Sequence, residues 1–285
     1  MLFDASFARE LEALRRRLRV RARSGGGGDH TAKRRGSSAE FLEHRPYAPG
    51  DDLRRIDWLA FARTGEPVFK LFRAEEDVVV RLVVDASASL EGDKLDVAKR
   101  VAAAIGYMAL ADSERAQVFA ASEGLAFVSE PARGRNALPK LLRDLDRVDL
   151  KSGTDLSRAI EQTILRSARP GMLVVISDFM DSGPFDAAIT RAAAAGHDVA
   201  LVQVLSRDEV EPHYDGDFAL VDAESSAVVE VTMDAGALEA YLARLNQLVL
   251  GLRALAKKVR GGYTRVVTDE PLLPAVRRFV GRVVD

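Results

Sequence analysis

Residues 78–89 read Val-Val-Val-Arg-Leu-Val-Val-Asp-Ala-Ser-Ala-Ser, and this stretch decides the fold of the chain. The run 78–84 is rich in β-branched residues and too short for a typical helix, so it predicts a buried β-strand. The strand leads directly into Asp85, Ser87 and Ser89. In an open α/β sheet, binding sites lie at the carboxyl ends of the strands. This Asp-x-Ser-x-Ser sequence is therefore the first candidate site.

The side chains of this candidate site all offer oxygen atoms. Hard cations such as Mg²⁺ prefer oxygen ligands, and Mg²⁺ keeps several waters, which leaves room for a further ligand. Two more oxygen donors lie at predicted element ends. Thr154 comes just before a predicted helix at 155–168, and Asp178 follows a predicted strand at 172–176. We expect Thr154 and Asp178 to join the first three residues at one edge of the sheet.

Short apolar runs alternate with amphipathic helical patterns along the rest of the chain. This alternation predicts an α/β fold with a doubly wound, mostly parallel sheet covered by helices on both faces. Strands are expected at 67–73, 78–84, 117–121, 125–128, 172–176, 199–205 and 264–267, and helices at 94–111, 135–146, 155–168, 184–195, 235–260 and 272–283. A small β-hairpin insertion is expected at 218–221 and 228–231. The α/β domain should span 77–285 and follow an N-terminal helical and irregular extension, 1–76.

Residues 2–23 have the pattern of an amphipathic helix. Phe7, Leu11, Leu14 and Leu18 recur at helical spacing, arginines cover the opposite face, and four glycines follow at 25–28. We expect the apolar stripe to pack on the protein's own body. The alternative is attachment of this basic helix to a membrane surface or to nucleic acid.

Composition excludes several classes of site. The 285 residues carry a net charge of −2 and contain no cysteine, which rules out disulfides and thiolate metal sites and gives no general attraction to nucleic acid. No G-x-x-x-x-G-K-[ST] sequence occurs, so a P-loop mechanism of ATP hydrolysis is not expected. The chain starts without a signal-peptide pattern, and the apolar run 101–111 is too short to span a membrane. We expect a cytoplasmic protein.

Residues 39–63 are dense in charged and aromatic side chains. The residues singled out are Arg45, Tyr47, Asp52, Arg55, Asp57, Trp58 and Arg63. Arginine–carboxylate pairs can form bidentate hydrogen bonds, so a polar network that fixes this segment on the main domain is the first interpretation. A surface with a direct functional role is the alternative.

The three oxygen-bearing segments resemble the metal-ion-dependent adhesion site of von Willebrand factor type A domains. The resemblance implies Mg²⁺ or Mn²⁺, with Ser87 and Ser89 as direct ligands and Thr154 bound directly or through water. Asp85 and Asp178 would act mainly through bound waters, and one position would stay open for an acidic side chain of a partner. Ala88 departs from the pattern, because a glycine is common there.

The upstream segment sharpens this match. Arg45-x-Tyr47-x-Pro-Gly-Asp-Asp, Arg55-x-Asp57-Trp and the Asp-x-Ser-x-Ser strand together resemble the bacterial family catalogued as domain of unknown function 58. That family is associated with AAA+ ATPases of the MoxR type. The resemblance implies a non-catalytic, chaperone-like adaptor that works with such an ATPase on an unknown client protein.

A Mg²⁺-dependent phosphohydrolase of the haloacid-dehalogenase type is the enzymatic alternative. In that class an aspartate at the end of the first strand is the nucleophile, here Asp85. A second acid is usual two residues later, where this chain has Ser87, and a lysine is needed to neutralise phosphate. No suitable lysine is evident in the sequence. We therefore favour a protein without enzymatic activity.

Overall fold

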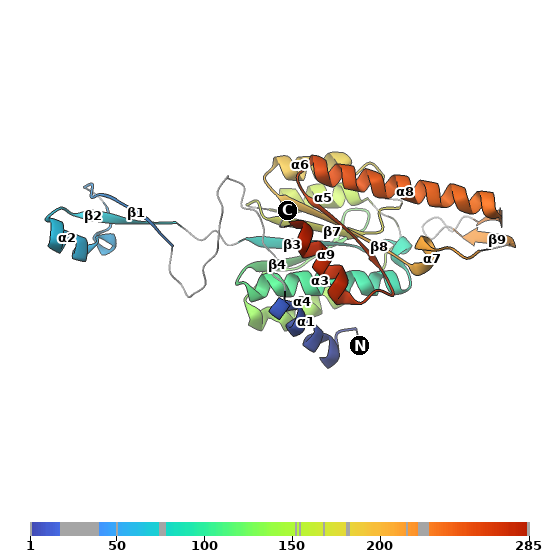
Figure 1. The fold of residues 1–285 in the computed structure, drawn as a ribbon, viewed down its shortest axis with the longest axis horizontal. Coiled ribbons are helices and arrows are strands. Elements are labelled where there is room, and N and C mark those ends of the chain that lie inside the picture. Colours follow the sequence, from blue (N-terminus) through green and yellow to red (C-terminus); the bar gives the residue numbers. More distant parts are fainter. Residues whose placement is uncertain are drawn as a thin grey trace. The chain divides into compact units, whose positions relative to one another are not determined.

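A computed structural model gives the fold of the chain (Figure 1). It describes residues 2–17, 40–49, 51–73, 78–151, 153, 155–167, 169–180, 183–214, 216–221 and 228–283. The chain forms two compact units: Met1–Gly26 with Val78–Asp285, here called the main unit, and Gly27–Asp77, the small unit.

This division differs from the predicted N-terminal extension, 1–76, because its first part groups with the main unit. The reason lies in helix α1 (Ala5–Arg17), whose side chains Phe7, Leu11 and Leu14 are buried in the main core. The expectation that this apolar stripe packs on the protein's own body is thus met for α1. Leu18 and the rest of 18–39 lie outside the described residues.

The main unit is built on one central sheet. Its strand order is β11 (Gly262–Val267), β8 (Asp198–Leu205), β7 (Met172–Ser177), β3 (Val79–Asp85), β4 (Arg115–Ala121) and β5 (Leu125–Val128), with β6 (Ala132–Arg133) also paired to β4. All neighbours from β11 to β4 are parallel, whereas β5 and β6 run antiparallel to β4. The predicted doubly wound, mostly parallel sheet is confirmed; only the short β6 was not predicted.

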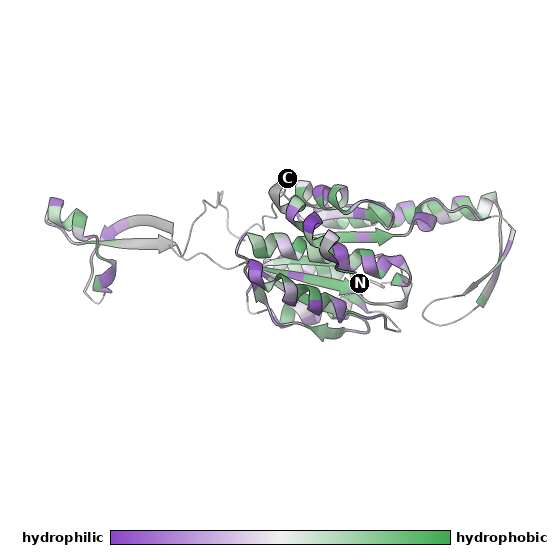
Figure 2. Cartoon of the chain, turned by 90° about the horizontal axis from the view of Figure 1, so that it is seen from below, coloured by the Kyte–Doolittle hydropathy of each residue, from purple (hydrophilic) through white to green (hydrophobic). Residues whose placement is uncertain are grey.

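Helices cover both faces of this sheet. One face packs against α3 (Asp93–Ala111), α4 (Leu138–Asp146) and α9 (Leu272–Val283), and α1 packs on α3. The other face packs against α5 (Leu156–Leu165), α6 (Asp186–Ala194) and α8 (Ala235–Lys258). The strands between these layers are apolar (Figure 2). This layering explains why the central runs lack the polar–apolar alternation of half-exposed strands.

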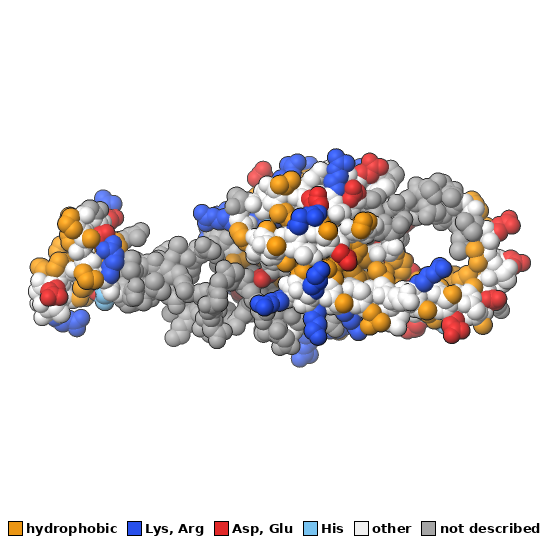
Figure 3. Space-filling view, turned by 90° about the horizontal axis from the view of Figure 1, so that it is seen from above, with side chains coloured by type: hydrophobic (Ala, Val, Ile, Leu, Met, Phe, Trp, Pro, Cys, Tyr) orange, Lys and Arg blue, Asp and Glu red, His pale blue; other side chains and the backbone are white. Residues whose placement is uncertain are grey.

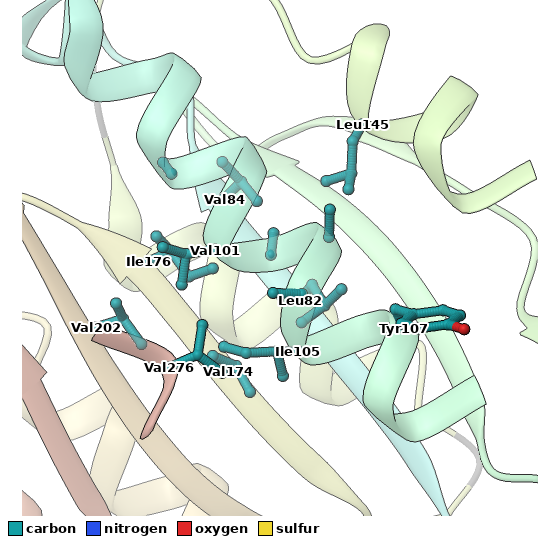
Figure 4. Close-up of a cluster of buried hydrophobic side chains, with 14 of the residues drawn as sticks. Leu82, Val84, Val101, Ile105, Tyr107, Leu145, Val174, Ile176, Val202 and Val276 are labelled. Carbon is teal, nitrogen blue, oxygen red and sulfur yellow. The ribbon is translucent and has the colours of Figure 1, made fainter. Parts of the chain in front are cut away.

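Strand β3 shows how the core is divided. Leu82 and Val84 point towards α3 and contact the cluster that contains Val101 and Ile105 (Figure 4). Val83 points to the opposite face, as successive residues of a strand must. Burial of each such side chain contributes about 1.5–3 kcal/mol. The strand that carries Asp85 is therefore anchored on both sides, which fixes the position of its carboxyl end.

Two further strands form the predicted hairpin insertion. Helix α7 (Arg207–Val210) follows β8, and β9 (Gly216–Val221) then pairs antiparallel with β10 (Val228–Met233) before α8 begins. The predicted insertion is confirmed, whereas α7 was not predicted.

The small unit is more regular than predicted. Strand β1 (Glu40–Pro46) pairs antiparallel with β2 (Val68–Arg73), and the connection holds a short 3₁₀ helix, η1 (Leu53–Arg55), and α2 (Trp58–Thr64). Strand β1 falls in a segment expected to be irregular, because its charged residues hide any apolar alternation. The buried apolar side chains described in this unit are Ile56, Ala60 and Phe69.

Candidate metal site at the carboxyl edge of the sheet

The strand order creates a switch point beside β3. The next strand along the chain, β4, lies on one side of β3, and β7 lies on the other. Ligand sites form at such points, where successive connections leave in opposite directions at the carboxyl ends of the strands. Asp85 is the last residue of β3, and Ser177 is the last residue of β7. The predicted site residues Asp85 and Asp178 therefore lie at one edge.

Asp85 is held in a fixed orientation. One carboxylate oxygen, Oδ1, accepts a hydrogen bond from the Ser87 N–H at 2.9 Å, and Oδ2 accepts one from the Ser177 hydroxyl at 2.6 Å. The residue is only 1% exposed. Burial raises the pKa of the Asp85 carboxyl, and the negative charge of Asp178 raises it further. The hydrogen bonds from Ser177 and Ser87 act in the opposite direction and lower this pKa. A nearby cation would favour the charged form.

The two serines lie side by side. Ser87 begins the 3₁₀ turn η2 (Ala88–Leu90), and its Oγ is 2.9 Å from the Oγ of Ser89. Ser87 is fully buried, whereas Ser89 is partly exposed. Two adjacent hydroxyl oxygens, one of them open to solvent, are the neutral donors that the sequence predicted.

The segment around Thr154 borders this pair, although Thr154 itself lies outside the described residues. Lys151 forms a parallel bridge with Ser87, and its N–H donates to the Ala86 carbonyl at 2.7 Å. Gly153 has a φ of +80°, a conformation that suits glycine. The role of Thr154 as a ligand stays a prediction.

Asp178 is oriented by a tight turn after β7. Phe179 adopts a φ of +59°, which is uncommon for a residue with a side chain. The turn directs the Phe179 N–H to the Ser177 hydroxyl at 2.9 Å and the Met180 N–H to Asp178 Oδ1 at 3.1 Å. The Gln203 side chain of β8 donates to the Asp178 carbonyl at 2.9 Å. These bonds leave the other carboxylate oxygen, Oδ2, for a further partner.

That partner is Lys94, which sequence reasoning missed. Its ammonium donates to Asp178 Oδ2 at 3.0 Å and to Glu209 Oε1 at 2.6 Å. The Lys94 side chain is 9% exposed and that of Asp178 only 2%. Burial opposes the charged ammonium, but the negative charges of Asp178 and Glu209 outweigh it, so the pKa of Lys94 is raised. The site thus contains a buried cation of its own.

A signal for Lys94 does exist in the sequence. It lies four residues before Ala98 and seven before Val101, both on the apolar face of α3. It also lies in the first turn of a helix, where the helix dipole disfavours a positive charge. A lysine on a buried face at such an unfavourable position needs nearby carboxylates. Glu209 could not be found in this way, because nothing in the sequence links α7 to α3.

The donor set fits a hard divalent cation, with one feature that opposes it. Among the described residues, no group of three or more His, Asp or Glu could hold a metal by itself. A cation here would depend on serine hydroxyls beside the two carboxylates, which suits Mg²⁺ or Mn²⁺ because both accept neutral oxygen ligands and waters. The opposing feature is the Lys94 ammonium at Asp178.

Comparisons with known proteins identify a family and relatives of this chain. The family model described as "Protein of unknown function DUF58" matches residues 43–247. The chain belongs to the DUF58 family. A relative of this DUF58 chain, "Uncharacterized protein Rv1480" of Mycobacterium tuberculosis (strain ATCC 25618 / H37Rv), is 35% identical over 270 residues, which cover 89% of this chain and 82% of the relative. "Uncharacterized protein MAV169" of Mycobacterium avium is 38% identical over 110 residues, 37% of this chain and 64% of the relative.

Two solved bacterial structures are similar to parts of this chain. The "conserved hypothetical protein BatB" of Bacteroides thetaiotaomicron has a TM-score of 0.46 and 16% identity, covering 73% of this DUF58 chain and 98% of its own. A "von Willebrand factor type A" protein of Catenulispora acidiphila has a TM-score of 0.36 and 19% identity, and the match covers 48% of this chain and 35% of that protein's chain.

The charged residues of the DUF58 segment in the small unit form local pairs. Arg45 binds Asp51 through two hydrogen bonds of 2.8 and 2.6 Å, and its guanidinium lies over the Phe69 ring, 4.7 Å from the centroid. Asp51 also accepts from the Ala48 N–H at 2.9 Å. The Asp51 side-chain hydrogen bond raises the pKa of Arg45. The Asp51 carboxylate thus links the Arg45 side chain to the Ala48 backbone within the small unit.

The other signature residues fix the connection between β1 and β2. Asp52 caps η1, accepting from the Arg54 N–H, and Asp57 caps α2, accepting from the N–H groups of Leu59 and Ala60. His44 lies 3.0 Å from Asp57. The remaining members are Tyr47, which is partly buried, Arg63, which is exposed, and Arg55, whose side chain lies outside the description. These described contacts lie within the small unit, and a polar network that fixes the segment on the main domain stays a prediction.

Trp58 lies on the surface of the DUF58 segment. It is 59% exposed and meets Phe61 edge-on, with ring centroids 6.1 Å apart. Leu53 and Leu59 are exposed nearby in the sequence, and hydrophobic side chains gather on the visible face of the small unit (Figure 3). The single tryptophan therefore does not act as a core anchor within this unit.

Proposed function

We propose that this DUF58 protein is a metal-dependent protein-binding adaptor without enzymatic activity. The cation would be Mg²⁺ or Mn²⁺, held at the edge where β3 and β7 end. One observation carries the proposal: two carboxylates and two adjacent hydroxyls converge at the switch point of a doubly wound sheet. The ligand set is Asp85, Ser87, Ser89, Thr154 and Asp178.

The residues divide the work at such a site. Ser87 and Ser89 would supply neutral oxygen ligands, while Asp85 and Asp178 would balance the charge through bound waters. Because the direct ligands are neutral and the two carboxylates act only through water, the cation keeps an attraction for an anionic direct ligand, so an acidic side chain of a partner protein is the favoured additional ligand. The bound cation would then join the two proteins through oxygen atoms on either side.

The geometry favours binding over phosphate hydrolysis. Lys94 supplies the lysine that the hydrolase alternative requires and that the sequence did not reveal. However, both oxygens of Asp85 accept hydrogen bonds and the residue is 1% exposed, so the carboxylate is poorly available as a nucleophile. Ser87 also stands where that class carries its second acid. Turnover of a generic phosphate ester with Mg²⁺ would overturn this assignment.

The partners belong to the proposal as well. The DUF58 resemblance supports an AAA+ ATPase of the MoxR type and a client protein that offers an acidic side chain, with chaperone-like maturation as the outcome. Within the described ranges, no helix combines the length and apolar character needed to cross a membrane. A cytoplasmic site of action is part of the same proposal.

Attachment through the N-terminal helix is the weaker alternative. The apolar face of α1 is occupied, because Phe7, Leu11 and Leu14 are at most 2% exposed in the main core. A helix that binds a membrane surface needs its apolar face free to enter the lipid. A vesicle and DNA binding assay at two salt concentrations would test this alternative.

A pull-down from native extract tests the proposed function. Tagged protein is incubated with Mg²⁺, with EDTA, and as the Asp85→Ala and Ser89→Ala variants in Mg²⁺. Retention of an AAA+ ATPase or a client in the first lane alone would support the proposal. The same partners in all lanes would contradict the metal requirement. Ser89 is partly exposed, so its truncation separates loss of a ligand from loss of the fold.

A further inference from the structure

The buried lysine at the edge of the sheet is not accounted for by the proposed ligand set. The Lys94 ammonium lies between Asp178 Oδ2, at 3.0 Å, and Glu209 Oε1, at 2.6 Å. The side chains of Lys94 and Asp178 are almost fully buried, and that of Glu209 is 21% exposed. A cation held at this point occupies one oxygen of a carboxylate that the metal site also needs.

The second carboxylate of this cluster is fixed independently of the lysine. Glu209 belongs to the capping box of α7: its Oε2 accepts from the Ser206 N–H at 2.7 Å, and the Ser206 hydroxyl accepts from the Glu209 N–H at 3.2 Å. The Tyr241 hydroxyl of α8 donates to the Glu209 carbonyl at 3.0 Å. Glu209 would therefore keep its position if Lys94 released Asp178.

We propose that Lys94 is a built-in counter-ion that competes with the divalent cation for Asp178 and thereby sets the metal affinity. When the metal binds, Asp178 turns to the hydration shell of the metal while Lys94 remains paired with Glu209. This inference rests on the proposed function, since it requires that the cluster of Asp85, Ser87 and Ser89 binds a divalent cation.

The competition follows from charge. Like charges in a partly buried site repel strongly, because the low local dielectric screens them little. An ammonium 3.0 Å from Asp178 therefore raises the free energy of a second cation there. Glu209 reduces this penalty, because it holds the ammonium from the other side. Lys94 should therefore weaken metal binding, and Glu209 should strengthen it. Glu209 does so by holding the Lys94 ammonium, so its effect should depend on the presence of Lys94.

A Mn²⁺ titration followed by the EPR signal of the free ion tests this arrangement on the full chain. Lys94→Met removes the charge and keeps the side-chain length, and should lower the Kd for Mn²⁺ about tenfold or more. Glu209→Gln should raise the Kd several-fold. In the Lys94→Met background, Glu209→Gln should change the Kd little. The double-mutant cycle should therefore show a large coupling free energy between the two residues. Lys94→Arg keeps the charge and should bind Mn²⁺ close to the wild type.

Lys99→Met is the matched control. Lys99 lies on the same helix and is 7% exposed, as is Lys94, so its replacement should leave the Kd unchanged. A folded Lys94→Met variant with unchanged or weaker Mn²⁺ binding would overturn the counter-ion role while leaving the proposed metal site intact. Should Lys94→Met fail to fold, an unchanged Kd in Glu209→Gln overturns it equally. Absence of Mn²⁺ binding in every variant would instead refute the proposed function itself, and the counter-ion role with it.

Discussion

The two units hold their charged pairs in opposite environments. In the main unit, Lys94 joins Asp178 and Glu209 inside the protein, with 9% of the lysine side chain exposed. In the small unit, Arg45 binds Asp51 with ideal bidentate geometry, but its side chain is 36% exposed. Both arrangements are hydrogen-bonded. They differ in how much water surrounds the charges.

This difference decides what each cluster contributes. Exposed pairs add little stability, because water and salt already screen their charges. Removal of one member of a buried pair is costly, because the remaining charge stays buried without compensation. The Arg45–Asp51 pair therefore shapes a turn, whereas the Lys94 cluster controls the electrostatics of the site beside it.

The largest effect is expected from breaking the buried cluster. Lys94→Met should lower the free energy of unfolding by about 3–5 kcal/mol without divalent ions, since Asp178 loses its buried counter-ion. Urea denaturation measures this loss. Addition of Mg²⁺ should restore part of it, because a ligand that binds only the folded state stabilises that state. A loss equal to that of Lys99→Met would contradict the special role of Lys94.

A second prediction concerns a buried carboxyl group without such a counter-ion. Burial, together with the charge of Asp112, raises the pKa of Glu114 to about 8. Within the described residues its Oε2 atom is buried and has no hydrogen-bond partner. The folded state thus keeps a proton that the unfolded chain releases near its ordinary pKa of 4.5. Stability should fall as pH rises from about 4.5 to about 8, by at most about 1.4 kcal/mol per pH unit.

Glu114→Gln checks the sign of this effect. The variant should be more stable than the wild type at pH 8 and should lose most of the pH dependence in that window. Thermal unfolding at pH 5, 6.5 and 8 measures both. A wild-type stability that rises with pH across the window, and that Glu114→Gln leaves unchanged, would refute the assignment.

A smaller effect is expected from removing a neutral donor at the site. Ser177→Ala deletes the hydroxyl that donates to Asp85 Oδ2 and accepts from the Phe179 N–H. Both partners are buried, so the cost should be about 1–3 kcal/mol. Calorimetric unfolding measures it, and Ser167→Ala, which removes a hydroxyl just after α5 that donates to the Thr163 carbonyl, is the control. Equal losses in the two variants would mean that Asp85 does not depend on Ser177.

The smallest effect should come from the exposed pair. Asp51→Asn removes the charge opposite Arg45, and the change in stability should be close to the error of a denaturation experiment and disappear in high salt. Denaturant titrations at low and high salt measure it. A loss comparable to that of Lys94→Met would show that the small unit depends on this pair.

Much of the fold follows from local sequence patterns. The apolar runs of β3, β7 and β8 are buried on both faces, and such runs leave few alternatives to a central parallel sheet. Asp85, Ser87, Ser89 and Asp178 could be predicted at one edge because each follows directly from a strand end. Ser177 was visible at the same point, but its bond to Asp85 depends on the register between β3 and β7.

The rest depends on contacts between distant segments. Glu209 lies 115 residues from Lys94 along the chain, and only the tertiary structure brings the two side chains together. The exposure of Trp58 was also beyond prediction, because a lone tryptophan among charged residues fits a core anchor and a surface residue equally well. Sequence patterns identify faces and ends, whereas pairs of buried charges need the tertiary structure.

The most direct test of the account is the number of Mn²⁺ ions bound per chain by wild type and by Ser89→Ala. We predict one ion per wild-type chain, displaced by excess Mg²⁺, and a markedly weaker site in Ser89→Ala with the fold unchanged by circular dichroism. An absence of bound Mn²⁺ in the wild type, or equal binding by both proteins, would contradict a metal site at the carboxyl edge of the sheet.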